Sequence, residues 1–241
     1  MRRELWIGLV MIALGLIAPL QAGVVTGSAD VSGTAIIWGA GNSTTAPDGQ
    51  AVLPPSVTFD LGATSISFSG FSGSVKYTGG ASPNGAEGQA GGTNLSGYGG
   101  ISGIQFVGRQ FFLVGVFLGP GAATGPAPAT LAYSGASSNV SVFNPLLSQV
   151  FFIGDGQGNT GQQTFNIPTG ATRLFWGFGD GVGSPATPGT YGDNSGSVSF
   201  SYAYEDGAAG QPLYNTPEPS SIVLMGLGIA ALTLLRRRRA S

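Results

Sequence analysis

The sequence predicts an all-β protein, a jelly-roll-like β-sandwich, and two observations carry that prediction. From Ser197 to Tyr204 large and small residues alternate, which is the period of a half-buried strand. Clusters of glycine, proline, asparagine and serine separate many similar short runs, and no window between the two ends of the chain has a helical period. Short strands divided by turn signals are typical of a sandwich or barrel.

The expected strands follow one another along the chain. Alternating runs predict strands at Val57–Leu61, Ser65–Phe68, Ser74–Tyr77, Asn139–Phe143, Gln163–Ile167 and Arg173–Phe178. Continuously apolar runs predict strands buried on both faces at Phe111–Leu118 and Gln149–Ile153. Three long connections remain, at Gly79–Gly103, Gly119–Thr130 and Asp180–Gly196. Connections of that length in a compact domain are functional or lack fixed structure.

The amino-terminal segment has the parts of a signal peptide. A basic start, an apolar run from Leu5 to Leu20 and a small residue at the exit predict cleavage after Ala22 by signal peptidase. The alternative is an anchor that stays in the membrane. The predicted leader is therefore residues 1–22, in a helical conformation.

The carboxyl-terminal segment mirrors this arrangement. A Pro217-Glu218-Pro219 triplet precedes an apolar run, Ile222 to Leu235, and then the four arginines 236–239. Fourteen helical residues cover about 21 Å, a marginal span for a hydrocarbon core about 30 Å thick. The arginines favour the cytoplasmic side, which leaves the preceding chain outside the cell.

This tail, residues 217–241, resembles the PEP-CTERM sorting signal in the order and position of its three parts. The resemblance implies a transmembrane helix that an exosortase recognises and cuts near the triplet. It also implies a Gram-negative host with an exopolysaccharide matrix, transient anchoring in the inner membrane, and a final place at the cell surface or in the extracellular matrix. The body would then be one domain, residues 23–216.

The composition of this body limits its partners and its chemistry. It has three basic side chains against nine acidic ones, a net charge of −6 that argues against nucleic acid. The chain has no cysteine, so its stability must come from the apolar core. It also has no histidine, which removes the commonest general base and leaves carboxylates for catalysis. We therefore expect a binding protein and not an enzyme, although a glycosidase pair such as Glu87 with Asp180 stays open.

The segment Gly156–Gly161 has the glycine spacing of a dinucleotide-binding loop. That motif requires a following helix, whereas the residues from Gln162 alternate like a strand. Asp155 also opens an imitation of a calcium loop of the EF-hand kind, but Asn166 stands where that loop requires glutamate. We predict a hairpin turn here.

The connection from Asp180 to Gly196 is the better candidate for a calcium site. Asp180, Asp193 and Asn194 offer three side-chain oxygen ligands in a turn rich in glycine, and calcium takes six to eight oxygens. The alternative is a polar turn whose Asx side chains bond their own backbone.

The stretch Pro188–Phe200 resembles the final calcium loop and strand of the bacterial calcium-dependent galactophilic lectins of the LecA type. The resemblance implies calcium held by Tyr77, Asp180, Thr190, Asp193 and Asn194, with the tyrosine and threonine acting through their carbonyls. It also implies that sugar hydroxyls bond to Asp180, Thr190 and Asp193. Gln89 is the candidate for a further sugar contact, while the histidine of those lectins has no counterpart.

Aromatic rings that stack on sugars are the last indicator. Trp176 lies in a predicted strand and belongs to the core, whereas Tyr98 and Tyr191 lie in connections and are the candidate platforms. The sequence thus predicts an exported, calcium-dependent, lectin-like protein that binds a glycan of the exopolysaccharide. The alternatives are a structural matrix or coat protein without sugar binding, and a hydrolase of exopolysaccharide.

Overall fold

The computed structural model describes residues 23–43, 51–59, 62–77, 83–180 and 191–206. All of them belong to one compact unit, Ala22–Gly210. The described part is all-β, as predicted, and its only helical turns are two 3₁₀ segments, η1 (Ile37–Gly39) and η2 (Tyr191–Asp193). The expected signal helix and sorting helix lie outside the described residues.

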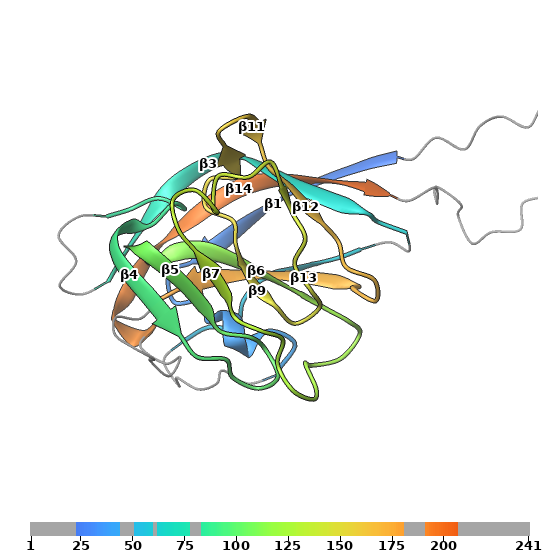
Figure 1. Cartoon of the computed structure of the whole chain (residues 1–241), viewed down its shortest axis with the longest axis horizontal. Helices are drawn as coiled ribbons and strands as arrows, with labels where there is room; N and C mark the ends of the chain where they lie inside the picture. Colours follow the sequence, from blue (N-terminus) through green and yellow to red (C-terminus); the bar gives the residue numbers. More distant parts are fainter. Residues whose placement is uncertain (1–22, 44–50, 60–61, 78–82, 181–190, 207–241) are drawn as a thin grey trace, which may run out of the picture. The chain divides into compact units, whose positions relative to one another are not determined.

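A five-stranded sheet forms one layer of the body, with the strand order β1-β14-β3-β12-β8. Figure 1 labels the first four of these strands. These strands are β1 (Gly23–Ser32), β14 (Asn194–Asp206), β3 (Ser65–Tyr77), β12 (Thr164–Asn166) and β8 (Val142–Phe143). The first and last strands of the chain are antiparallel neighbours, and Gly23 lies opposite Asp206. Both ends of the described body therefore lie together.

A four-stranded sheet and a three-stranded sheet complete the fold. The four-stranded sheet has the order β2-β13-β6-β9, with β2 (Ser56–Thr58), β13 (Arg173–Gly179), β6 (Phe112–Leu118) and β9 (Val150–Phe152). The three-stranded sheet contains β4 (Gln89–Leu95), β5 (Ile104–Gln110) and β7 (Leu131–Tyr133). A two-stranded hairpin, β10 (Gln157–Gly158) with β11 (Gly161–Gln162), confirms the predicted turn.

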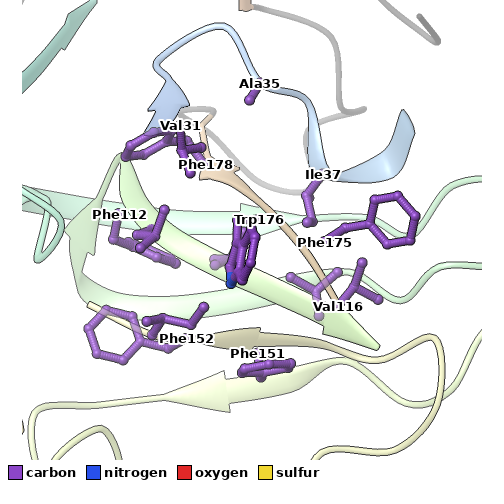
Figure 2. Close-up of a cluster of buried hydrophobic side chains, with 14 of the residues drawn as sticks. Val31, Ala35, Ile37, Phe112, Val116, Phe151, Phe152, Phe175, Trp176 and Phe178 are labelled. Carbon is purple, nitrogen blue, oxygen red and sulfur yellow. The ribbon is translucent and has the colours of Figure 1, made fainter. Parts of the chain in front are cut away.

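Aromatic packing joins the sheets into one core. Figure 2 shows the part of this core around Trp176. Trp176 of β13 is 1% exposed, which confirms its predicted place in the core. Its ring contacts Phe200 of β14 edge-on at 5.4 Å between centroids, so the four-stranded sheet faces the five-stranded one. Phe106 of β5 contacts Phe112 of β6 at 5.3 Å, which attaches the three-stranded sheet. Every residue of β6 and β9 is buried, as their apolar runs predicted.

The strand pairing departs from an all-antiparallel jelly roll in two places. β5 pairs with β7 and β12 pairs with β8 in parallel, while the other strand pairs are antiparallel. The structure contains more than one sheet, as the predicted sandwich requires. The alternation of residues did not reveal the third sheet or the parallel pairs.

Several stretches were predicted incompletely. Ser65–Phe68 and Ser74–Tyr77 form one strand, β3. Gly73 lies between them, opposite Val198, and has a φ of +84°. A side chain at this position would strike the Ser197 carbonyl, so glycine allows the strand to continue. The expected connection Gly79–Gly103 is wrong in part, since it contains β4. β1, β5 and β7 were not expected either. In β1 small residues hide the alternation.

Candidate functional site

The end of the body where β13 stops and β14 begins gathers most of the predicted calcium ligands. Asp180 follows the last residue of β13, and Asn194 is the first residue of β14. Asn194 lies opposite Tyr77, the last residue of β3, in the antiparallel ladder. Residues far apart in the sequence thus meet because β3 and β13 end, and β14 begins, at the same end of the body.

The Asn194 side chain holds this end together. Its Nδ2 donates to Asp180 Oδ2 at 2.8 Å and to the Gly33 carbonyl at 2.9 Å. Asp180 and Asn194 are each 8% exposed. The Asn194 Oδ1 atom is buried, and no hydrogen-bond partner was found for it among the described residues. A buried amide oxygen without a donor is costly, so this atom is the chemically unusual feature of the site.

Tyr77 and Gln89 form the second part of the site. The Tyr77 hydroxyl accepts a hydrogen bond from Gln89 Nε2 at 2.9 Å and another from Gln110 Nε2 at 3.1 Å. Gln89, predicted as a sugar contact, therefore lies beside a predicted calcium ligand. Its amide nitrogen is engaged within the protein.

The remaining predicted ligands are Asp193 and Thr190. Asp193 is exposed in η2, directly before Asn194. Thr190 lies outside the described residues. Within the described ranges, no cluster of three or more histidine, cysteine or acidic side chains could hold a metal. A calcium site here would depend on amide and carbonyl oxygens in addition to the carboxylates.

The prediction that Tyr191 is an exposed platform for a sugar is wrong. It is fully buried and its hydroxyl donates to the Phe178 carbonyl at 2.6 Å. The polar group satisfies a backbone acceptor, so the ring packs in the core instead of facing solvent. Tyr98 is 41% exposed and keeps an accessible face.

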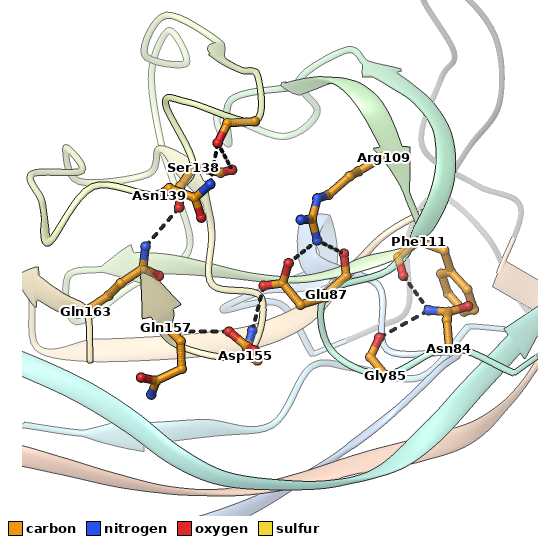
Figure 3. A network of polar contacts seen from close by, with 11 residues as sticks. Asn84, Gly85, Glu87, Arg109, Phe111, Ser138, Asn139, Asp155, Gln157 and Gln163 are labelled. Atoms are coloured by element: carbon orange, nitrogen blue, oxygen red, sulfur yellow. Dashed lines mark hydrogen bonds and ion pairs between the residues drawn. The ribbon is translucent and has the colours of Figure 1, made fainter. Parts of the chain in front are cut away.

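A second polar cluster surrounds Glu87 (Figure 3). Its carboxylate forms an ion pair with Arg109 and accepts a hydrogen bond from the Asp155 backbone N–H at 3.0 Å. Burial raises the pKa of Glu87, against the lowering effects of the Asp155 hydrogen bond and of Arg109. Gly154 is required beside it, because a side chain there would strike Glu87. The cluster fastens the start of β4 to the turn after β9.

Sequence reasoning named Glu87 only as a possible catalytic acid and did not connect it to Arg109. The signal was present, since Arg109 is one of only three basic residues between the two end segments. A rare charge between apolar residues requires a partner. The observed partner indicates a structural ion pair in which Glu87 is already engaged.

Comparison with known families decides the role of the chain's end. Residues 215–239 match the PEP-CTERM protein-sorting motif. The protein is therefore directed to export and to processing by an exosortase. No curated protein and no solved structure matches the chain. The resemblance to the galactophilic lectins receives no support from these comparisons.

Among the described residues, no helix has both the length and the apolar character that crossing a membrane requires. The matched motif itself, with its apolar run, lies outside the described residues.

Proposed function

We propose that this exosortase-sorted protein acts outside the cell as a calcium-dependent carbohydrate-binding module of the matrix. In this proposal the host is a Gram-negative bacterium, and the tail anchors the chain in the inner membrane until the exosortase cuts it. Calcium would be held by Asp180, Asp193 and Asn194 through side chains, and by Tyr77 and Thr190 through carbonyls.

The observation that carries this proposal is the buried pair of Asp180 and Asn194, with an amide oxygen that lacks a donor. Turning the amide about its last bond exchanges Nδ2 with Oδ1, and these atoms are nearly indistinguishable by shape. After that exchange the amide oxygen faces the Asp180 carboxylate and the Gly33 carbonyl. Three converging oxygens repel one another unless a cation lies between them, which is the chemistry that calcium requires.

The sugar would complete the shell of the ion with two hydroxyls. Gln89 is the adjacent amide, held beside Tyr77 by their hydrogen bond. Its carbonyl oxygen is a hydrogen-bond acceptor for a further sugar hydroxyl.

Isothermal titration with calcium tests the metal part of the proposal. Asp193→Ala should weaken binding more than Asn194→Ala, because a carboxylate attracts a divalent ion more strongly than an amide does. Asp180→Ala should act like Asp193→Ala. Asp155→Ala is the control and should leave the affinity unchanged. Loss of affinity in the control alone would move the metal to another turn.

A glycan array, probed with calcium and again with chelator, tests the sugar part. Retention that depends on calcium supports the module. Calcium binding without retention of any glycan favours the second candidate, a structural matrix or coat protein. The observation in favour of that candidate is that the Asn194 amide nitrogen donates hydrogen bonds to the Asp180 carboxylate and the Gly33 carbonyl, which engages both of these oxygens within the protein.

Hydrolysis of exopolysaccharide is the third possibility. Its candidate carboxylates, Glu87 and Asp180, are engaged with Arg109 and Asn194 respectively. Release of reducing ends from matrix polysaccharide would reveal such an activity, and their absence leaves the binding and structural roles.

A further inference from the structure

The free edges of the three main sheets differ in length. Among the described residues, four of the six edge strands, β2, β7, β8 and β9, contain only two or three residues. Short edges offer few unpaired backbone groups and so resist pairing with other chains. β1, with ten residues, is the longest exception.

β1 also has little of the usual protection of an edge, since Asp30 is its one charged residue. Its sequence, Gly23–Ser32, contains no lysine, arginine or proline. All ten residues pair with β14 without a register shift, so no bulge twists the edge away. Its outward residue Val24 is 67% exposed. A long, regular edge of this kind is suited to accept another strand.

We propose that the edge of β1 pairs with β1 of a second copy of this chain, so that two five-stranded sheets become one. Antiparallel pairing about a two-fold axis is self-complementary. Centred on Gly27, it joins residues 23–31 of the two copies and keeps the core-facing side chains on one face.

Charge and hydrogen bonding favour this arrangement over a parallel one. Asp30 is the one charged residue of β1. In the antiparallel register it lies opposite Val24 of the second copy, whereas a parallel pair in register would oppose two aspartates, which is destabilising. The same antiparallel register sets Thr26 opposite Ser28, a favourable cross-strand pair.

The ends of the chain are compatible with this dimer. β1 begins at the first residue after the predicted leader, so cleavage leaves nothing in front of the edge. The carboxyl-terminal ends of the two bodies, opposite Gly23 in each copy, would be about 30 Å apart along the paired strands. The ten residues 207–216 reach about 35 Å when extended, so both tails can reach one membrane.

Disulfide trapping tests the pairing, because the chain has no cysteine of its own. Two differently tagged copies of the full chain, one with Thr26→Cys and one with Ser28→Cys, are expressed together in the native host and oxidised on intact cells. The opposed positions lie within the Cα separation that a disulfide requires. We expect a cross-linked dimer that carries both tags, several-fold more abundant than the dimer from either variant alone, whose cysteines are diagonal.

The matched control is Ser201→Cys, an exposed serine opposite Ser28 on β14 and therefore one strand away from the edge. It should give no dimer. Adding Ser28→Lys to the Thr26→Cys copy should reduce trapping with the Ser28→Cys copy, since lysine protects edges. A trapped product that contains a different protein, equal trapping by Ser201→Cys, or no dimer from the mixed pair would each overturn the proposal.

Discussion

Replacing Asn194 with aspartate distinguishes a calcium site from a structural lock, by which we mean a metal-free contact in which the Asn194 amide bonds Asp180 and Gly33. The substitution preserves size and exchanges the amide nitrogen for a second carboxylate oxygen. In a structural lock this oxygen faces the Asp180 carboxylate across the 2.8 Å that the hydrogen bond now spans. In a calcium site the same oxygen becomes an additional charged ligand.

The two interpretations predict changes of opposite sign in the free energy of unfolding. Without metal, two like charges about 4 Å apart near a protein surface repel by about 4 kcal/mol. The lost bond to Gly33 adds about 1 kcal/mol. We expect the free energy of unfolding to fall by about 4 kcal/mol or more, which lowers the melting temperature by roughly 10 °C for a body of this size. Protonation of one carboxyl group limits the loss.

With calcium, the added charge should tighten binding. Free calcium at a hundred times its Kd stabilises the folded state by about 2.7 kcal/mol through linkage. Thermal melts of the wild type and Asn194→Asp, in millimolar calcium and in chelator, measure both effects. We expect Asn194→Asp to melt below the wild type in chelator and to gain more than the wild type from calcium.

The matched control is Asn42→Asp, which makes the same change of charge at an exposed position. It should melt like the wild type in both conditions. If calcium fails to raise the melting temperature of either the wild type or Asn194→Asp, the metal is not bound at this end and Asn194 serves as a structural lock alone.

Three further outcomes follow from the structure and the sequence. Gly196→Ala should destabilise the body by about 2 kcal/mol or more, because Gly196 has a φ of +82° and a side chain there would strike the Ser74 carbonyl across the ladder. Urea unfolding measures this loss. The control is Gly92→Ala, which has open space around it and should be close to neutral. Because burial raises the folded-state pKa of Glu87, its protonated form contributes stability at low pH that is lost as the pH rises through that pKa. The stability of the wild type relative to Glu87→Gln should therefore decline as the pH rises above about 4.3, and a difference independent of pH would contradict it. Intact-mass measurement from the native host should find a chain that begins near Gly23 and ends near Pro217, and a full-length mass would refute both cleavages.

Most strands that carry large residues were predicted from the sequence, although β5 and β7 were not. The face of β14 with Val198, Phe200 and Tyr204 is buried as the alternation indicated. The glycine-rich strands were not predictable, because β1 and β4 contain few large side chains to mark an inner face. Their conformation is fixed by backbone pairing with β14 and β5, which is a property of the partners.

The candidate site was predicted in its residues and not in its contacts. The spacing of Asp180, Asp193 and Asn194 indicated oxygen ligands in one turn. It did not indicate that the Asn194 amide reaches Gly33, which is 161 positions away in the sequence. That contact exists because β1 pairs with β14 as far as Ser32 and Ser197, which brings Gly33 to the start of β14.

The sequence by itself determined that the chain is exported and sorted, because a sorting tail is a linear signal that can be read without a fold. It also determined the all-β class, through the period of its residues. Only the tertiary structure decided which polar groups meet and which rings are accessible. Tyr191 illustrates the reason: its position in a loop indicated exposure, but the Phe178 carbonyl satisfies its hydroxyl and burial of the ring then becomes favourable.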